Sequence, residues 1–465
     1  MAGLFDTLAL GANSLSTYRK AIDTTGHNLA NVNTPGYTRQ RLLIEATTVD
    51  GGAWGPIGNG SEAVKIQQLQ NKSTLKQLQI EASVEGSLSA KQEALQQALV
   101  FLQESIDRNG GSGTNTKGIS QGLADFFAAA QSVAASPASL ADRQLFLEKA
   151  QELATKFNIA DARLGTLQQG LSDRVAAEVA EANALVTEIA KLNESIVSEE
   201  ALSPGYANDL RDSRQLKLEA LAKLVKIDTA EQENGAINVS IGGNLVVDGR
   251  EVAGILETFD SGGGNLQVRL AGQGTALALT GGSIQGSISV RDGELAGLRS
   301  EINQLASTLI SEVNAVHSAG FGLDGTTGAN YFTGTAAADI AVNSAIVTNP
   351  RLFQASGVAG ESGNNTVAQA IAALNQKTHA GLGGVSFSNK QAATIAALGQ
   401  ELATAESELA DQKTISQFVR NQRDSISGVS VDEEMTNLIM FQKAFQASAK
   451  LISMTDEMLA TIIEM

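Results

Sequence analysis

The sequence lacks cysteine entirely and has little proline, histidine or aromatic side chain. It contains 5 prolines and 3 histidines, and aromatic residues make up 4% of its 465 positions. Without cysteine, disulfides, thiol catalysis and thiolate metal sites are excluded. A core with few aromatic rings is built from small aliphatic side chains, which suit long packed helices better than deep ligand pockets. No apolar run reaches the roughly 20 residues that a membrane-spanning helix needs.

Positive charge is also scarce. The chain has 33 basic and 50 acidic residues, for a net charge of −17. Such an acidic surplus argues against binding to nucleic-acid phosphate. Only Met1 to Phe5 precede Asp6, whereas a secretory signal needs a basic start and a longer apolar segment. We therefore expect a protein that is cytoplasmic or exported without a cleaved signal peptide.

No group of residues converges on a reaction. His27, His317 and His379 lack a second ligand at metal-binding helical spacing, and we expect His27 and His317 to pack or to form hydrogen bonds. The run Ser73–Lys76 matches S-x-x-K, but the motifs that accompany it in penicillin-binding enzymes are missing. The segment 324–328 has one carboxylate, which favours a turn over a cation site. We assign no catalytic, metal-binding or cofactor-binding residue and predict that the protein is not an enzyme.

The first thirty residues have the spacing of a packed helix. Apolar residues alternate at intervals of four and three: Leu4, Leu8, Leu15, Tyr18, Ile22 and Leu29, with Gly11 and Thr25 in the two remaining places. Such a heptad pattern indicates a helix that packs lengthwise on other helices. It ends at 33–37, where Pro35 lacks an amide N–H and Gly36 permits a positive φ.

The last forty residues repeat this spacing. The apolar positions are Leu438, Phe441, Phe445, Ile452, Leu459 and Ile462, with Ser448 and Thr455 in the polar places. Ser430 and Glu433 form a capping box at the start of this helix. We predict an antiparallel pair that brings residues 31–37 close to 427–430. The predicted assembly interface, within or between subunits, is Leu8, Leu15, Ile22 and Leu29 with Leu438, Phe441, Phe445, Ile452 and Leu459.

Between the two ends the chain is largely helical. Helical patterns cover about 64–106, 140–200, 209–225 and 298–316, while 38–63 has no clear pattern and we expect it to be irregular. In the longest stretch, one ladder comprises Phe146, Ala150, Leu153, Phe157, Ala160, Leu164, Leu167 and Leu171. A second ladder continues after a shift in phase with Val175, Val179, Ala182, Val186 and Ile189. Such a shift resembles a stutter, which locally unwinds a supercoil.

The spacing of apolar residues changes at Lys226. From there to about Val290 apolar residues alternate with period two, and Asp248-Gly249 is a hairpin signal. We predict a mainly α fold with an inserted small antiparallel β subdomain, a long helical bundle in the middle, and terminal helices that pair like a coiled coil. The predicted domains are 1–50 with 426–465, 51–225 with 294–425, and 226–293.

One motif points to a family. The run 29–37, with Ala30, Asn31, Thr34, Pro35, Gly36 and Tyr37, resembles the N-terminal signature of bacterial flagellar axial proteins. The stretches 208–214, 309–332 and 425–435 resemble the hook-associated proteins of that family. Phe441 and Phe445 stand where this family usually has tyrosine, which removes two hydroxyls but keeps the apolar area.

The resemblance implies a structural role in the extracellular flagellum. The chain would polymerise as a hook–filament junction subunit that filament assembly requires, its terminal helices forming an inner tube. It would be exported unfolded through the flagellar type III apparatus. Implied partners are further copies in a ring, hook protein on the proximal side, hook-associated protein 3 on the distal side and an export chaperone, with no cofactor, nucleic acid or membrane. A second apolar stripe, Met440, Leu451, Met454 and Met458, is the candidate chaperone-binding surface.

Two alternatives stay open at this point. The chain could be another axial protein of hook or distal rod type, although the long helical region 64–225 weighs against a hook subunit. It could also be an adhesin or enzyme that carries flagellar ends. That alternative needs a catalytic cluster or a large extra domain within 226–360, and the sequence shows neither.

Overall fold

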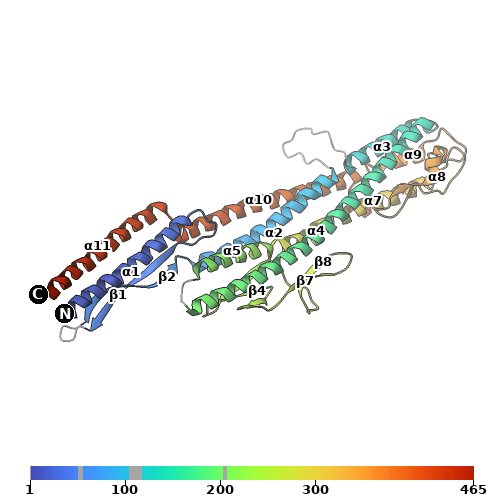
Figure 1. Cartoon of the computed structure of the whole chain (residues 1–465). Helices are drawn as coiled ribbons and strands as arrows, with labels where there is room; N and C mark the ends of the chain where they lie inside the picture. The colour runs from blue at the N-terminus through green and yellow to red at the C-terminus, as the bar shows by residue number, and fades with distance from the viewer. Residues whose placement is uncertain (1, 51–55, 104–117, 203–206, 465) are drawn as a thin grey trace.

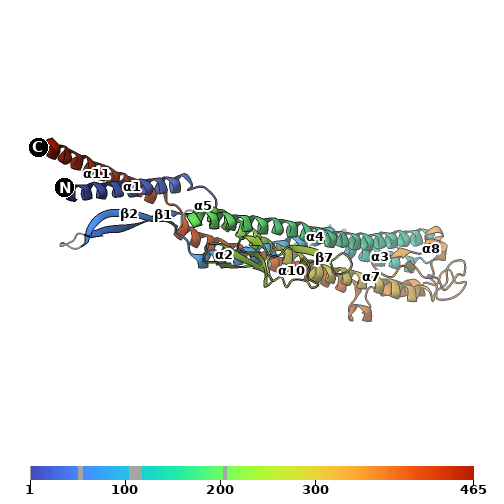
Figure 2. The ribbon, with the colours of Figure 1, turned by 60° about the horizontal axis from the view of Figure 1, so that its bottom comes forward.

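The molecule is a long, mainly helical rod (Figure 1). The computed structural model describes residues 2–50, 56–103, 118–202 and 207–464. Both chain ends lie at one tip, where α1 (Ala2–Ala30) and α11 (Val431–Glu464) run side by side. The remaining length is built from α2 (Lys72–Leu102), α3 (Ile119–Ala135), α4 (Leu140–Leu202), α5 (Asn208–Leu224), α7 (Ala296–His317) and α10 (Phe387–Ser427) (Figures 1 and 2). The predicted fold class is confirmed.

A β-hairpin follows α1. Strands β1 (Gln40–Asp50) and β2 (Pro56–Gln68) pair antiparallel, with Gln40 opposite Gln68. The prediction of an irregular 38–63 is therefore wrong, as is the helix predicted to begin at 64. Register shifts between Leu43 and Ile44 and between Ala46 and Thr48 break the alternation. Bulges of this kind obscure the alternation of apolar and polar residues that predicts a strand, because each one moves the following side chains to the other face.

The 63-residue helix α4 crosses two separate cores. Its first apolar ladder, from Phe146 to Leu171, is buried against α2, α3, α7, α9 (Thr366–Ala373) and α10, in what we call the tip core. Its second ladder, from Val175 to Ile189, is buried against α5 and the β region, in what we call the β core. The phase shift in the sequence thus marks the point where α4 turns a different face to a different set of partners.

The β region is antiparallel, as predicted. Strands β3 (Ile227–Glu231), β4 (Ile237–Ile241), β5 (Asn244–Asp248) and β6 (Glu251–Val252) form one sheet in chain order, and β7 (Leu256–Asp260) pairs with β8 (Leu266–Leu270). The predicted turn lies between β5 and β6, with Gly249 at φ +57°. The predicted end of this region at 293 is wrong, since α6 (Ser283–Val290) is already helical.

A π-helical turn, η2 (Arg291–Leu295), joins α6 to α7. It places the fully buried Arg291 between the β region and α4. Arg291 Nη1 donates to Ser172 Oγ at 2.9 Å and to the carbonyl of Leu266 at 2.8 Å. Gln168 Nε2 donates to the Arg291 carbonyl at 3.3 Å. One buried guanidinium therefore ties strand β8 to α4.

The far tip contains short elements around an aromatic cluster. These are β9 (Phe332–Thr333), β10 (Ala341–Val342), α8 (Ser344–Thr348), η3 (Pro350–Leu352) and η4 (Ala380–Leu382). His317 packs there against Tyr331 and Phe353. Its Nδ1 lies 2.7 Å from the Ala329 carbonyl, and its Nε2 accepts from the Gln354 N–H at 3.0 Å. Burial lowers the pKa of His317 to about 4, so it is a neutral hydrogen-bonding residue, as expected.

Candidate functional site

The terminal helices pack in opposite directions. A Cβ placed on Gly11 would lie 2.7 Å from Ile452 Cγ1, and at the other end Asn28 Nδ2 donates to Glu434 Oε2 at 3.0 Å. Residue numbers rise along α1 while they fall along α11, so the pair is antiparallel. The two breaks consequently meet, and the Arg39 N–H donates to the Ser427 carbonyl at 2.8 Å.

All nine residues of the predicted assembly interface are half-buried within the single chain. They are Leu8, Leu15, Ile22, Leu29, Leu438, Phe441, Phe445, Ile452 and Leu459. Each therefore keeps part of its apolar surface exposed after α1 and α11 have packed together. Their role between subunits stays a prediction.

The most buried residues of α1 are instead small and mostly polar, and they were not among the predicted interface residues. They include Ser14, Thr17, Ala21, Thr24 and Asn28, which also alternate at intervals of three and four. Thr17 Oγ1 donates to the Ser61 carbonyl of β2 at 2.8 Å. A hydroxyl-rich heptad line was the available signal, because small side chains allow a strand to approach a helix closely.

The four chaperone-binding candidates on α11 do not share one environment. Met440, Met454 and Met458 are about half exposed. Leu451 is half-buried, and its Cδ2 lies 3.4 Å from where a Cβ on Gly11 would be. The three methionines thus form an uncovered stripe, while Leu451 also contributes to the contact with α1.

The signature run caps α1 and turns the chain. Asn31 Nδ2 donates to the His27 carbonyl at 3.0 Å, and Thr34 Oγ1 donates to Asn31 Oδ1 at 3.1 Å. Gly36 has φ +77°, and any Cβ there would collide with the side chain of Leu216. Ala30 is the last residue of α1, and Pro35 lies within the turn. These residue types therefore direct the chain from the helix into β1, with a positive φ at position 36 and the Leu216 side chain packed against it.

A cluster of polar side chains lies next to this turn, where α1, the hairpin, α5 and α11 meet. We call it the polar junction, and it comprises His27, Asn28, Tyr37, Arg39, Gln40, Gln68, Asp209, Asp212 and Glu434. Asn28 is buried at its centre. Its Oδ1 accepts from Tyr37 Oη at 2.8 Å and from the Gln40 N–H at 2.9 Å, while its Nδ2 donates to the Gln40 carbonyl at 2.8 Å. One amide therefore fixes the end of α1 to the start of β1 and, through Glu434, to α11.

The first turns of α5 hold the other side of the polar junction. Asp212 accepts from the Thr38 N–H and from Gln68 Nε2, both at 2.9 Å, and Gln40 Nε2 donates to Asp209 Oδ1 at 2.8 Å. Burial raises the pKa of Asp212 to about 6, against the opposing effect of these hydrogen bonds. Burial and then the Asp209 carboxylate raise the pKa of the Tyr37 phenol well above its ordinary value. His27 Nδ1 lies 3.0 Å from that phenol oxygen.

Arg39 secures the start of α11. It pairs with Glu433 at 2.7 Å and with the buried Glu434 at 2.7 Å. The helix begins directly after Ser430, as the capping pattern predicts. Glu433, expected to cap the backbone, has its carboxylate on this arginine. The polar junction thus joins α1, α11, the hairpin and α5, which are far apart in sequence.

Metal centres and membrane-spanning helices are two further features that bear on function. Among the described residues, no group of three or more His, Asp or Glu is arranged to hold a metal ion. None of the described helices is long and apolar enough to cross a membrane. The Asp324 carboxylate accepts from the N–H and the hydroxyl of Thr326, which makes it part of a turn.

Three family models match the sequence. Residues 8–38 match the flagella basal body rod protein model, and residues 420–465 match the C-terminal model of the flagellar basal body rod FlgEFG protein. Residues 104–332 match the helical domain of the flagellar hook-associated protein FlgK. The matched regions include most of the two terminal helices and the central stretch from α3 through α7.

Whole-length relatives and one solved structure agree with these matches. The chain is 26% identical to flagellar hook-associated protein 1 of Bacillus subtilis over 510 aligned residues, covering 100% of this chain and 98% of that protein. It is 22% identical to the Escherichia coli protein of the same name, with 100% of both chains covered. The flagellar hook junction protein FlgK of Burkholderia pseudomallei has the same fold, with a TM-score of 0.63 at 16% identity over 76% of this chain and 100% of that chain.

Proposed function

The chain belongs to the flagellar hook-associated protein 1 family, and we propose that it polymerises into the structural adaptor that joins hook to filament. It is thus an axial structural protein of the bacterial flagellum. The family match over 104–332 removes the hook and distal rod alternatives.

One observation carries the polymerisation proposal: the terminal module has almost no core of its own. We define this module as α1, the β1–β2 hairpin and α11. Among its described residues, Ala21 is the sole apolar side chain that is buried, and neither core cluster includes a residue from it. Two helices and a two-stranded hairpin with so little buried apolar surface are marginally stable alone. Neighbouring subunits would supply the missing apolar contacts.

The half-buried seam fits this role. We infer that Leu8, Leu15, Ile22 and Leu29, together with Leu438, Phe441, Phe445, Ile452 and Leu459, pack both within the pair and against neighbouring copies. Each of these side chains has a covered and an uncovered side. A tube built from such pairs buries the uncovered side of every subunit.

The proposed partners follow from the place of the family in the flagellum. The protein associates with the hook and with other flagellar proteins. We propose that copies form a ring with hook protein on the proximal side and hook-associated protein 3 on the distal side. Export through the flagellar type III apparatus without a cleaved signal, and capture of the methionine stripe by a chaperone, are further parts of this proposal.

We propose the same three domains with two changed boundaries. The hairpin spans the boundary first drawn at residue 50, since β1 and β2 pair along most of their length. The terminal domain is better drawn as 1–68 with 426–465. The helical middle and the inserted β region follow, and the latter ends before α6.

Electron microscopy of a deletion strain tests the function. Cells lacking the gene should make hooks without filaments and release filament protein into the medium. A plasmid copy should restore attached filaments. Normal filaments on the deletion strain would rule out the junction role.

A further inference from the structure

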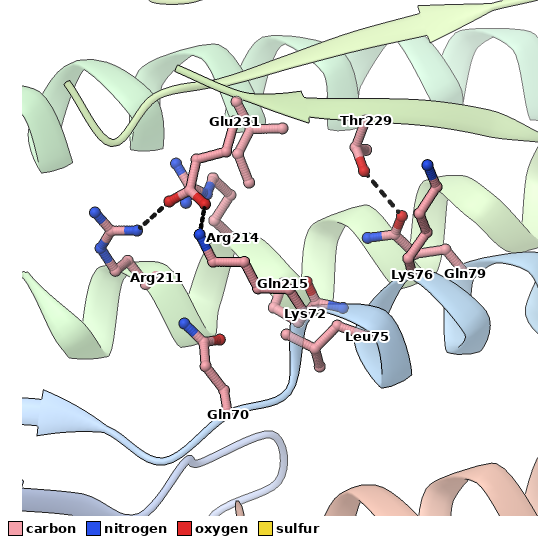
Figure 3. A pocket seen from close by; sticks show the side chains of 11 residues that line it. Gln70, Lys72, Leu75, Lys76, Gln79, Arg211, Arg214, Gln215, Thr229 and Glu231 are labelled. Carbon is pink, nitrogen blue, oxygen red and sulfur yellow. Dashed lines mark hydrogen bonds and ion pairs between the residues drawn. The ribbon is translucent and has the colours of Figure 1, made fainter. Parts of the chain in front are cut away.

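A small polar pocket lies where the connector from β2 to α2 meets the body (Figure 3). It has a volume of about 180 Å³. Its lining includes the cationic side chains of Lys72, Lys76, Arg211 and Arg214 but one carboxylate, Glu231. Acidic residues outnumber basic ones 50 to 33 in the whole chain, so this pocket reverses the overall balance of charge.

The carboxylates nearby do not neutralise the pocket. Glu231 is shared by Lys72 and Arg211, and Arg211 also pairs with Glu200 at 2.8 Å. Lys76 makes no ion pair with any residue that the structure describes. Four cationic groups against two carboxylates leave a surplus of two positive charges.

Arg214 is the unusual member. It is almost fully buried, yet its Nη1 donates to neutral acceptors, Asn193 Oδ1 at 2.7 Å and the Gly235 carbonyl at 2.8 Å. Burial lowers its pKa to about 10. A buried cation is normally paired with a carboxylate, so an anion in the adjacent pocket would be favoured.

Gln79 supplies an independent indication of a ligand. Its side chain is 5% exposed, and its Oε1 accepts from Thr229 Oγ1 at 3.3 Å. Its amide nitrogen donates to no acceptor among the described residues, and Figure 3 shows that nitrogen directed into the pocket. An anionic oxygen in the pocket would accept a hydrogen bond from this nitrogen.

We propose that this pocket receives an aspartate or glutamate side chain from a second copy of this chain. A pocket of about 180 Å³ accommodates a carboxylate with its methylene stem. Cofactor and drug-sized ligand pockets are larger, at about 300–1,000 Å³. A second copy carries a net charge of −17, so it offers the complementary charge.

The position of the pocket agrees with that occupant. It lies beside the connector that leads out of the terminal module, whose scarcity of buried apolar side chains already implies neighbouring copies. The inference thus rests on the proposed function, since polymerisation is what brings a second copy to this place.

Carbodiimide coupling of purified hook–filament junctions tests the inference, because the reagent joins a lysine amine to a carboxylate in contact with it. Mass spectrometry should find Lys76 linked to an aspartate or glutamate of a second copy in junctions and not in monomer. Lys76→Gln should abolish this link, whereas Lys191→Gln, at an exposed lysine outside the pocket, should leave it unchanged. The link between Lys72 and Glu231 within one chain shows that the reagent enters the pocket.

If that internal link forms while neither Lys72 nor Lys76 is joined to a second copy, the inference is wrong. Coupling to a different protein alone, or an inorganic ion as the sole occupant, overturns it equally. Filaments remain attached to hooks in such a preparation, so this failure is separate from a failure of the junction role.

Discussion

At the scale of single residues, the polar junction gives a physical reason for the signature run at 29–37. Asn28 precedes the signature run and was not among the predicted site residues, yet it is the buried centre of the network. It lies on the small, polar line of α1, but its partners Gln40 and Glu434 come from β1 and α11, so spacing alone did not reveal its central role. Tyr37, which the signature does include, donates a hydrogen bond to that amide and also lies within 3.0 Å of His27 Nδ1.

Asp212 should make the stability of the polar junction depend on pH. Its pKa is raised from 3.8 to about 6 in the folded chain, so the folded state holds the proton more tightly than the unfolded state does. This contribution is fully present below about pH 4 and is lost as the pH rises through 6. Compared with Asp212→Asn, the wild type should lose up to about 3 kcal/mol of unfolding free energy over that range.

Urea denaturation of both proteins from pH 3.5 to 7.5, followed by circular dichroism, measures that difference. The asparagine variant is the control, because it keeps the size of the side chain and does not titrate. If the unfolding free energy of the wild type instead rises with pH relative to that of Asp212→Asn, the folded chain holds Asp212 as the carboxylate and the prediction is wrong.

Gly86 should be intolerant of any side chain. It lies inside α2, and a Cβ there would collide with the Lys223 carbonyl at the end of α5. Alanine normally improves a helix, but here overpacking should make Gly86→Ala less stable by roughly 1–3 kcal/mol. Gly170 in α4 has open space around it, so Gly170→Ala should gain about 0.5–1 kcal/mol. Thermal melts of the two variants should therefore shift in opposite directions.

At the scale of elements, the seam between α1 and α11 is the part to test first. Ile22→Ala and Ile452→Ala each truncate a half-buried side chain, and truncating a fully buried isoleucine costs roughly 2–5 kcal/mol. A loss of even part of that size recurs in every subunit of the assembly. We expect normal secretion, loss of filament protein to the medium and poor motility.

Ile255→Ala is the matched control, since this isoleucine is 55% exposed in the β region. Filaments should remain attached in that variant. Normal junctions with either seam variant would show that the seam is not an assembly interface. A block in secretion would place these residues in export instead.

The methionine stripe of α11 gives a separate test of chaperone binding. Met454 and Met458 are exposed, whereas Leu451 also contacts α1. The double variant Met454→Asp, Met458→Asp should therefore abolish chaperone capture in a pull-down without disturbing the helix pair. Met435→Asp is the control on the same helix, because Met435 is exposed but out of register with the stripe. Equal capture by the double variant and the control would refute the hypothesis.

At the scale of the whole molecule, the rod has two cores in its body and almost none in its terminal module. The body should therefore be the stable unit, and the ends should open locally at a small free-energy cost. Limited proteolysis of purified monomer should trim both ends and leave a fragment of about 69–426. Protection of both ends in a verified monomer would contradict the idea that neighbouring copies stabilise them.

Particular elements show how far the sequence could be read. The phase shift after Leu171 was visible in the spacing, because one helix must present its apolar side chains to whatever packs on it. The spacing did not show that the two ladders of α4 pack into different cores, since the tip core and the β core are assembled from segments far apart in the chain. The hairpin β1–β2 was not predicted for a similar reason: a bulge is defined by how a strand pairs with its partner, and the sequence of one strand does not show that pairing.

By itself, the sequence determined most of the helices, the antiparallel β region, the break after α1, the opposing seams and the resemblance to flagellar axial proteins. These depend on periodicity and on local backbone preferences, which act over a few residues. Tertiary structure alone decided the roles of Asn28, Asp212, Arg291 and the cationic pocket. Each of those side chains is polar, and its effect depends on which distant acceptor or charge lies within about 3 Å of it. Spacing along a chain does not encode that proximity, because folding brings the partners together from separate elements.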